Sequence, residues 1–208
     1  RILCIAFSKD NRIFVSGSED GSICLWHIEN KNSLVHTIEI KLKSQISINL
    51  SKKIKAVALS ADNQWMAIGC GNNSIYLYNL TEDSSPKLRH TLAGHSGAIN
   101  MLAFSAHDAQ LASASEDCTI RLWQVTDENI QLSSTILAGH THLPDSDSFI
   151  PDKKIGVSSI AFSSDRNKWL LASGGEDKTI RTWSLDDLSS PRQVLTGHEG
   201  AILSLEFS

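Results

Sequence analysis

The feature that most constrains the fold of this chain is a short apolar run that returns five times. The copies read ILCIAF, IKAVAL, INMLAF, VSSIAF and ILSLEF, and they end at Phe7, Leu59, Phe104, Phe162 and Phe207. The spacings are 52, 45, 58 and 45 residues, so a base period of 45 carries about 7 extra residues in one copy and about 13 in another. A period in this range predicts a repeat architecture, in which each copy is one supersecondary unit stacked on its neighbours.

One copy, Gly94 to Trp123, shows what the unit contains. INMLAF is a short apolar run of the kind that a doubly buried strand has, whereas QLASAS and TIRLW alternate between apolar and small or polar residues. Glu116-Asp117-Cys118 separates these two segments as a tight turn, and a weaker strand signal follows at 130–137. Each copy is therefore predicted to be four short antiparallel strands, lettered a to d in chain order.

Two motifs recur at the same period and carry a family resemblance. The dipeptide Gly-His recurs with its histidine at His95, His140 and His198, and the turn with the strand after it recurs as SEDGSICLW, SEDCTIRLW and GEDKTIRTW. This pattern resembles the WD-repeat β-propeller family over nearly the whole chain. The usual Trp-Asp dipeptide is absent, since His27, Gln124 and Ser184 follow the tryptophans.

The resemblance implies an all-β fold, a β-propeller of four-stranded antiparallel blades. We expect residues 1–208 to be a partial propeller, a segment of a larger ring, because members of this family usually have six to eight blades. The expected parts are four full blades and one extra innermost strand, at 1–40, 54–92, 98–137, 156–195 and 201–207.

Blade 2 departs from the pattern. Its alignment on blade 3 places Ile68, Asn72 and Tyr78 at the positions of Ser113, Asp117 and Trp123, and no Gly-His precedes it. The strand pattern is intact, so this blade is expected to form without an internal polar network.

Two segments between blades are polar. Residues 41–53 carry Lys41, Lys43, Lys52 and Lys53, with Lys55 just beyond, and are read either as a basic contact loop or as a solvated connection. The insertion at 141–155 is read as a polar loop whose role stays open.

Blade 3 holds a serine, a histidine and an aspartate, as a hydrolase triad would. Repetition argues against catalysis, because a catalytic site need occur once whereas a scaffold device occurs in every unit. The resemblance implies instead a buried hydrogen-bond chain from the Trp indole to Ser, His and Asp. The expected members are His95, Ser113, Asp117 and Trp123 in blade 3; His140, Ser173, Asp177 and Trp183 in blade 4; Ser16, Asp20 and Trp26 in blade 1; and His198.

The face that carries the d–a and b–c loops is the expected partner surface, because this face commonly docks peptides or proteins in the family. Glu19, Glu116 and Glu176 each precede a network aspartate and are read either as an acidic arc for a basic partner or as ordinary turn residues. Arg121 and Arg181, on strand c, are expected on the lateral surface.

Other site chemistries are weakly supported. His140 and His142 with Asp145 and Asp147 could suggest a metal cluster, but His140 already has a structural task, so neither a metal nor a cofactor is expected. A net charge of −4 disfavours sequence-independent nucleic-acid binding, and no apolar run is long enough to span a bilayer. Four cysteines without metal-type spacing suggest reduced thiols, hence a cytoplasmic protein.

These observations predict a non-catalytic scaffold for protein–protein contact. The alternative is a sensor or autoinhibitory module of a larger enzyme, such as an NTPase or a protease, with its catalytic part outside these residues. Both interpretations depend on fold-level analogy.

Overall fold

The computed structural model describes residues 1–32, 37–47, 53–81, 85–106, 110–125, 131–142, 156–165 and 170–207. Within these ranges every regular element is a β-strand, and the strands form four antiparallel sheets of four strands each. In each sheet the strands pair in chain order, as in a meander. The all-β fold of four-stranded blades predicted from the repeats is confirmed.

Blade 1 consists of β1 (Ile2–Phe7), β2 (Ile13–Ser18), β3 (Ser22–Asn32) and β4 (Thr37–Ser47). Blade 2 consists of β5 (Ile54–Leu59), β6 (Trp65–Cys70), β7 (Ile75–Asn79) and β8 (Lys87–Leu92). Blade 3 consists of β9 (Ile99–Phe104), β10 (Gln110–Ser115), β11 (Thr119–Gln124) and β12 (Gln131–Ala138). Blade 4 consists of β13 (Val157–Phe162), β14 (Leu170–Gly175), β15 (Ile180–Ser184) and β16 (Gln193–Leu195).

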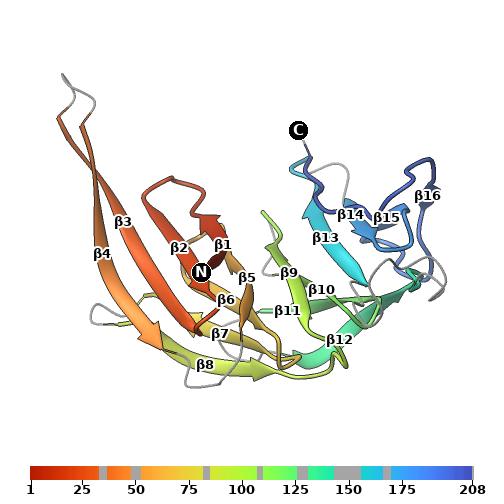
Figure 1. Cartoon of the computed structure of the whole chain (residues 1–208), viewed down its shortest axis with the longest axis horizontal. Helices are drawn as coiled ribbons and strands as arrows, with labels where there is room; N and C mark the ends of the chain where they lie inside the picture. The colour runs from red at the N-terminus through yellow and green to blue at the C-terminus, as the bar shows by residue number, and fades with distance from the viewer. Residues whose placement is uncertain are drawn as a thin grey trace.

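The four blades stand side by side along an arc (Figure 1). Their first strands β1, β5, β9 and β13 contact one another in sequence along the inside of the arc, and β4, β8, β12 and β16 lie on the outside. The d–a and b–c loops therefore gather at the same end of the sheets, which forms the loop face.

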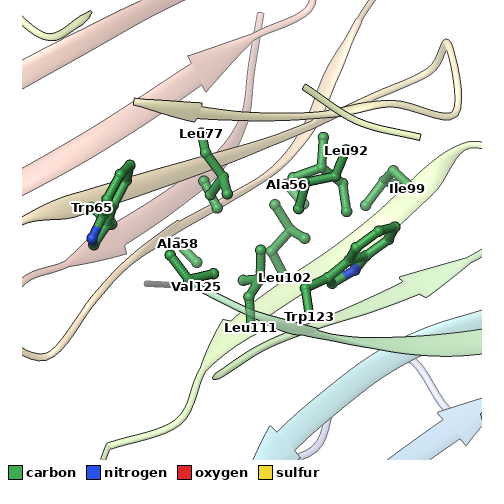
Figure 2. Packing of buried hydrophobic residues seen from close by; sticks show 12 residues of the cluster. Ala56, Ala58, Trp65, Leu77, Leu92, Ile99, Leu102, Leu111, Trp123 and Val125 are labelled. Atoms are coloured by element: carbon green, nitrogen blue, oxygen red, sulfur yellow. The ribbon is translucent and has the colours of Figure 1, made fainter. Parts of the chain in front are cut away.

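Three apolar clusters fill the spaces between neighbouring blades. Figure 2 shows the cluster between blades 2 and 3, where Trp123 and Leu111 pack against residues such as Ala56 and Leu77. The other two clusters lie between blades 1 and 2 and between blades 3 and 4. Since each blade buries its faces against its neighbours, the stability of the arc comes from the interfaces between repeats.

A small residue on strand b receives a branched residue from the next blade. A Cβ atom added to Gly69 would lie 2.6 Å from Ile99 Cγ2, and one added to Gly17 would lie 2.6 Å from Ile54 Cγ2. At the same position of blade 3 stands Ala114, and it faces a cluster that contains the smaller Val157. The pairs Gly with Ile and Ala with Val thus keep the volume of the contact nearly constant.

The predicted end of blade 1 at residue 40 is wrong. Strand β4 continues to Ser47, with Ser22 opposite Ser47 and Asn32 opposite Thr37. The reason is that β3 is 11 residues long and offers pairing partners along its whole length. Residues 41–47 are therefore strand and not a loop, and residues 48–52 lie outside the described ranges.

The extra innermost strand expected at 201–207 is also not formed. Ile202 N donates to Gly175 O at 3.1 Å and Leu205 N donates to Ser159 Oγ at 3.0 Å. This segment therefore lies against the face of blade 4 that points away from blade 3. No strand of the described chain lies beside it, and a strand needs a neighbour for its ladder.

Candidate functional site

The b–c turn of every blade is built in the same way. A carboxylate or amide oxygen accepts the backbone N–H two residues on, at 2.8 Å for Asp20, 3.3 Å for Asn72, 2.9 Å for Asp117 and 3.1 Å for Asp177. The residue after this one adopts a left-handed backbone, with φ of 83° at Gly21, 67° at Asn73, 65° at Cys118 and 64° at Lys178. Such Asx turns hold the second oxygen of the carboxylate in one direction.

In blade 3 the second carboxylate oxygen of Asp117 is hydrogen-bonded to two residues of the d–a loop. His95 Nδ1 lies 2.8 Å from Asp117 Oδ2, and Ser96 N donates to the same oxygen at 2.9 Å. His95 Nε2 lies 2.8 Å from Ser113 Oγ, which accepts Trp123 Nε1–H at 2.9 Å. The structure thus brings the four residues predicted for blade 3 into one chain.

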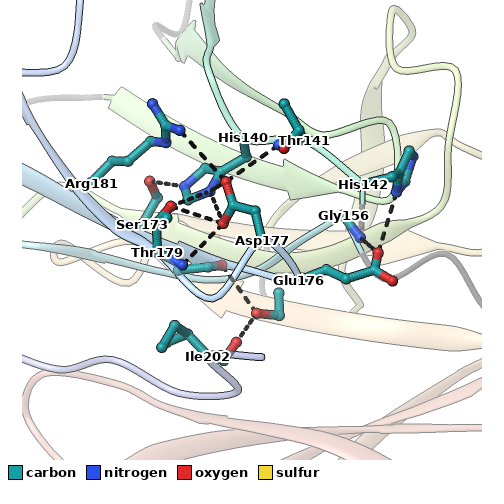
Figure 3. A network of polar contacts seen from close by, with 12 residues as sticks. His140, Thr141, His142, Gly156, Ser173, Glu176, Asp177, Thr179, Arg181 and Ile202 are labelled. Carbon is teal, nitrogen blue, oxygen red and sulfur yellow. Dashed lines mark hydrogen bonds and ion pairs between the residues drawn. The ribbon is translucent and has the colours of Figure 1, made fainter. Parts of the chain in front are cut away.

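Blade 4 repeats this arrangement, and Figure 3 shows its members His140, Ser173 and Asp177. His140 Nδ1 lies 2.9 Å from Asp177 Oδ1, His140 Nε2 lies 2.8 Å from Ser173 Oγ, and Trp183 Nε1 donates to Ser173 Oγ at 2.9 Å. Because Nδ1 of each histidine faces a carboxylate, the partners assign the proton to Nδ1 and leave Nε2 to accept the serine hydroxyl.

The remaining predicted network residues are not brought into such a chain. In blade 1, Trp26 Nε1 donates to Ser16 Oγ at 2.9 Å, but the Asp20 carboxylate is exposed and bonds Ser22. His198 is exposed and bonds no network residue among the described residues. In blade 2, Ile68 and Tyr78 belong to the same apolar cluster, as expected for a blade without the polar network.

The sequence suggested that Arg121 and Arg181 lie on an open lateral surface, but both are only partly exposed. The Arg181 guanidinium lies 3.6 Å from Asp177 Oδ2, and a Cβ added to Gly139 would lie 2.9 Å from Arg181 Nη1. Gly94 stands in the same relation to Arg121, at 2.8 Å. Each histidine follows a glycine because the arginine guanidinium occupies the space that a side chain at the glycine position would need.

Sequence reasoning named these arginines but missed their contacts with the glycine of Gly-His and with the aspartate, although a signal was present. Arginine occupies this strand c position in blades 3 and 4, which have Gly-His, whereas blade 2 lacks Gly-His and has Tyr76 there. Tyr76 Oη accepts a hydrogen bond from Asn72 Nδ2 at 2.8 Å, so an uncharged pair takes the place of Arg181 and Asp177.

The pKa values of both network aspartates and of His140 are shifted by their surroundings. Burial by itself raises the pKa of Asp117, but the hydrogen bonds from His95 and Thr119 outweigh it and hold that pKa well below its usual value. The pKa of Asp177 is lowered in the same way by His140 and Thr179. Burial lowers the pKa of His140, and Asp177 offsets this in part.

The three glutamates of the predicted acidic arc each have a partner. Lys53 Nζ lies 2.5 Å from Glu19 Oε1, and Lys55 Nζ lies 2.5 Å from Glu116 Oε1. The Glu176 side chain is 9% exposed, and its Oε2 lies 3.2 Å from both Gly156 N and His142 Nδ1. The arc is therefore less negative than the sequence suggests, because a lysine from a neighbouring blade neutralises each of two of its members.

The pair of Lys55 with Glu116 comes from a feature of the inner strands. Each inner strand has an irregularity in its register at the second residue, which is Leu3, Lys55, Asn100 or Ser158. Lys55 Nζ reaches Asn100 Oδ1 at 2.8 Å, and Asn100 Nδ2 donates to Val157 O at 3.0 Å. Bulges re-aim side chains, and here they aim them at the next blade.

The remaining features weighed from the sequence are a metal cluster, the cysteines and membrane spans. Within the described residues no group of His, Cys, Asp and Glu could hold a metal ion, while Asp145 and Asp147 lie outside those residues, as does the insertion from 143 to 155. The four cysteines are free thiols. No helix that could cross a membrane occurs in the described part of the chain.

Comparison with known proteins places this geometry in a family. The family model "WD domain, G-beta repeat" (WD40) matches residues 1–27, 42–79, 86–124 and 148–184, which together are more than half of the chain. The chain is 36% identical over 128 residues to the Polycomb protein EED of Chaetomium thermophilum, and 31% identical over 118 residues to the Nuclear distribution protein PAC1-1 of Uncinocarpus reesii. These alignments cover 61% and 57% of the chain, and 20% and 23% of the relatives.

Two solved structures are similar in fold over 97% of the chain. The structures titled "Structure of U3-55K" and "Crystal structure of RRP9 WD40 repeats" each superpose with a TM-score of 0.73, at 22% and 23% identity. The chain covers 54% and 53% of these two structures, and about a fifth of the relatives compared by sequence. The chain belongs to the WD40 repeat family and forms part of a WD40 β-propeller.

Proposed function

We propose that this part of the propeller is a non-catalytic scaffold that presents its loop face to a protein or peptide partner. The observation that carries the proposal is the His–Asp contact in blades 3 and 4, which joins the d–a loop to the b–c turn of the same blade. A loop pair held in this way keeps one conformation, so less ordering entropy is lost when a partner binds.

The residues after the two histidines are the exposed part of this arrangement. Ser96 and Thr141 are exposed, and their backbone N–H groups donate to Asp117 Oδ2 and Asp177 Oδ2 at 2.9 and 3.3 Å. The network thus orients two neighbouring points on the loop face, while its own members stay below the surface.

Burial supports a structural and not a catalytic role for the serines. Ser113 and Ser173 are both 0% exposed, and each hydroxyl is engaged by a tryptophan and a histidine. A nucleophile must reach its substrate, and neither hydroxyl can do so without opening the interface between two blades.

The chemistry of the partner stays a proposal. Since Glu19 and Glu116 are already paired with lysines, attraction of a basic peptide is not the feature on which the scaffold function depends. The cytoplasmic location and the alternative of a module in a larger enzyme stay predictions, and the latter concerns residues outside these 208.

The test is a loop-face variant with a control on the opposite end of the sheets. Ser96→Arg with Thr141→Arg places two bulky cations on the loop face without removing a network side chain. Ser190→Arg, in the connection between β15 and β16, is exposed and serves as the control. Proteins captured from extracts by the wild-type chain should be lost with the double variant and retained with Ser190→Arg, when all three melt alike. Equal capture by all three would remove the proposal.

A further inference from the structure

The fourth strand of each blade is an edge of its sheet. Among the described residues, β4, β8, β12 and β16 each have a neighbouring strand on one side and none on the other. An open edge presents backbone N–H and C=O groups to any other extended chain. Natural proteins usually protect such edges with charges, with proline or by keeping the strand short.

Three of the four edges have this protection. Strand β4 carries Glu39, Lys41 and Lys43, and β8 carries Lys87 and Arg89. Strand β16 is three residues long and follows Pro191 and Arg192.

Strand β12 is different. It has the sequence QLSSTILA over eight residues, with neither a charge nor a proline. Thr135, Ile136 and Ala138 are exposed, with Ile136 at 48%, and only Leu137 between them is buried. From Thr135 to Ala138 the pairing with β11 is regular, with Arg121 opposite Ile136 and Ile120 opposite Leu137. The outer edge here is thus regularly paired, accessible and rich in residues that favour strands.

We propose that β12 accepts an extended segment of a partner protein as a fifth strand of blade 3. The backbone of β12 supplies the hydrogen bonds, and its exposed side chains choose the partner through cross-strand contacts. Because no residue of β12 is charged, a charged side chain on the added strand loses water and gains no opposite charge in β12. The segment that fits is uncharged and rich in threonine, valine and isoleucine.

This surface differs from the one in the proposed function. Strand β12 lies on the outside of the arc (Figure 1), whereas the scaffold proposal concerns the loops at one end of the sheets. The two surfaces can therefore be occupied at the same time, and either proposal can fail without the other.

The test uses displayed random peptides of about 12 residues, which is longer than a typical strand. Peptides selected on the wild-type chain are measured by fluorescence anisotropy against the wild type, Ile136→Lys and Val194→Lys. Val194 is the matched control, because it is 45% exposed, lies on the outer strand β16 and stands opposite Arg181 as Ile136 stands opposite Arg121. Both positions are exposed, so both variants should fold, and thermal melting checks this.

The expected result is a set of uncharged peptides whose affinity falls about tenfold for Ile136→Lys, since lysine on an edge discourages strand addition. The same affinity should change less than about twofold for Val194→Lys, a surface change away from the site. Bound peptide should also slow amide hydrogen exchange in residues 131–138. Failure to select such peptides, or equal binding to both variants, would overturn the proposal. Self-association that Ile136→Lys abolishes and Val194→Lys leaves intact would also overturn it, since a second copy would then occupy the edge.

Discussion

Replacing Gly69 by alanine tests directly whether the blades are held together by matched volumes. The new Cβ would lie 2.6 Å from Ile99 Cγ2 and 2.9 Å from Ile99 Cβ, so Ile99 or the whole neighbouring strand must shift. Overpacking of this kind costs about 1–3 kcal/mol. The gain from replacing a glycine within a strand is about 0.5–1 kcal/mol. The difference lies between about 0 and 2.5 kcal/mol, so we expect Gly69→Ala to lower the free energy of unfolding by about 1 kcal/mol.

A double-mutant cycle combines Gly69→Ala with a second substitution, Ile99→Val. On its own it removes a buried methyl group and should cost about 1 kcal/mol. In the Gly69→Ala background the smaller side chain can move away from the new Cβ, which reproduces the Ala114 and Val157 combination of the next interface. The double variant should therefore be more stable than the sum of the two single effects by about 1 kcal/mol.

Urea unfolding of the wild type, both single variants and the double variant measures this coupling. Gly71→Ala is the matched control, because a Cβ there would meet only Lys53 O at 3.8 Å. Gly71→Ala should leave the free energy of unfolding nearly unchanged, and its effect should add to that of Ile99→Val. Additivity of Gly69→Ala and Ile99→Val within about 0.3 kcal/mol would refute the volume argument.

Two further predictions concern the polar network. Asp117→Ala should lower the free energy of unfolding by about 1–3 kcal/mol, because it leaves the buried Nδ1–H of His95 without its acceptor. Asp20→Ala should cost less in the same denaturation assay, since Asp20 is exposed; equal losses would contradict this. The pKa of His140 is lower in the folded state, so the unfolded chain binds a proton first, and stability should fall as the pH drops below about 6.5. A His140→Gln variant should lose this part of the pH dependence of the melting temperature, and an unchanged pH profile would argue against it.

Much of the fold could be predicted because the same pattern recurs in several repeats, so that each copy supports the interpretation of the others. The spacing of the apolar runs located the blades, and the recurrence of Gly-His and of the b–c turn assembled the residues that the structure brings together in blades 3 and 4. Strand β4 was predicted too short although Ile38, Ile40 and Leu42 continue the alternation, because its lysines suggested a loop.

What the sequence did not reveal depends on contacts between elements. The pairing of Lys55 with Glu116 joins two blades, and the register between blades comes from packing and not from spacing along the chain. The contact of Arg181 with Gly139 likewise depends on how far a long side chain folds back over its own blade.

The measurement that tests the account most directly is long-range ¹H–¹⁵N NMR of the histidine side chains. If the recurring polar chain braces the loops from within, His95 and His140 will both show the neutral tautomer with the proton on Nδ1 and a slowly exchanging Nδ1–H signal. The exposed His198 serves as the internal reference, and its ring protons should exchange fast. Fast exchange at His95 and His140, or the proton on Nε2, would contradict the account.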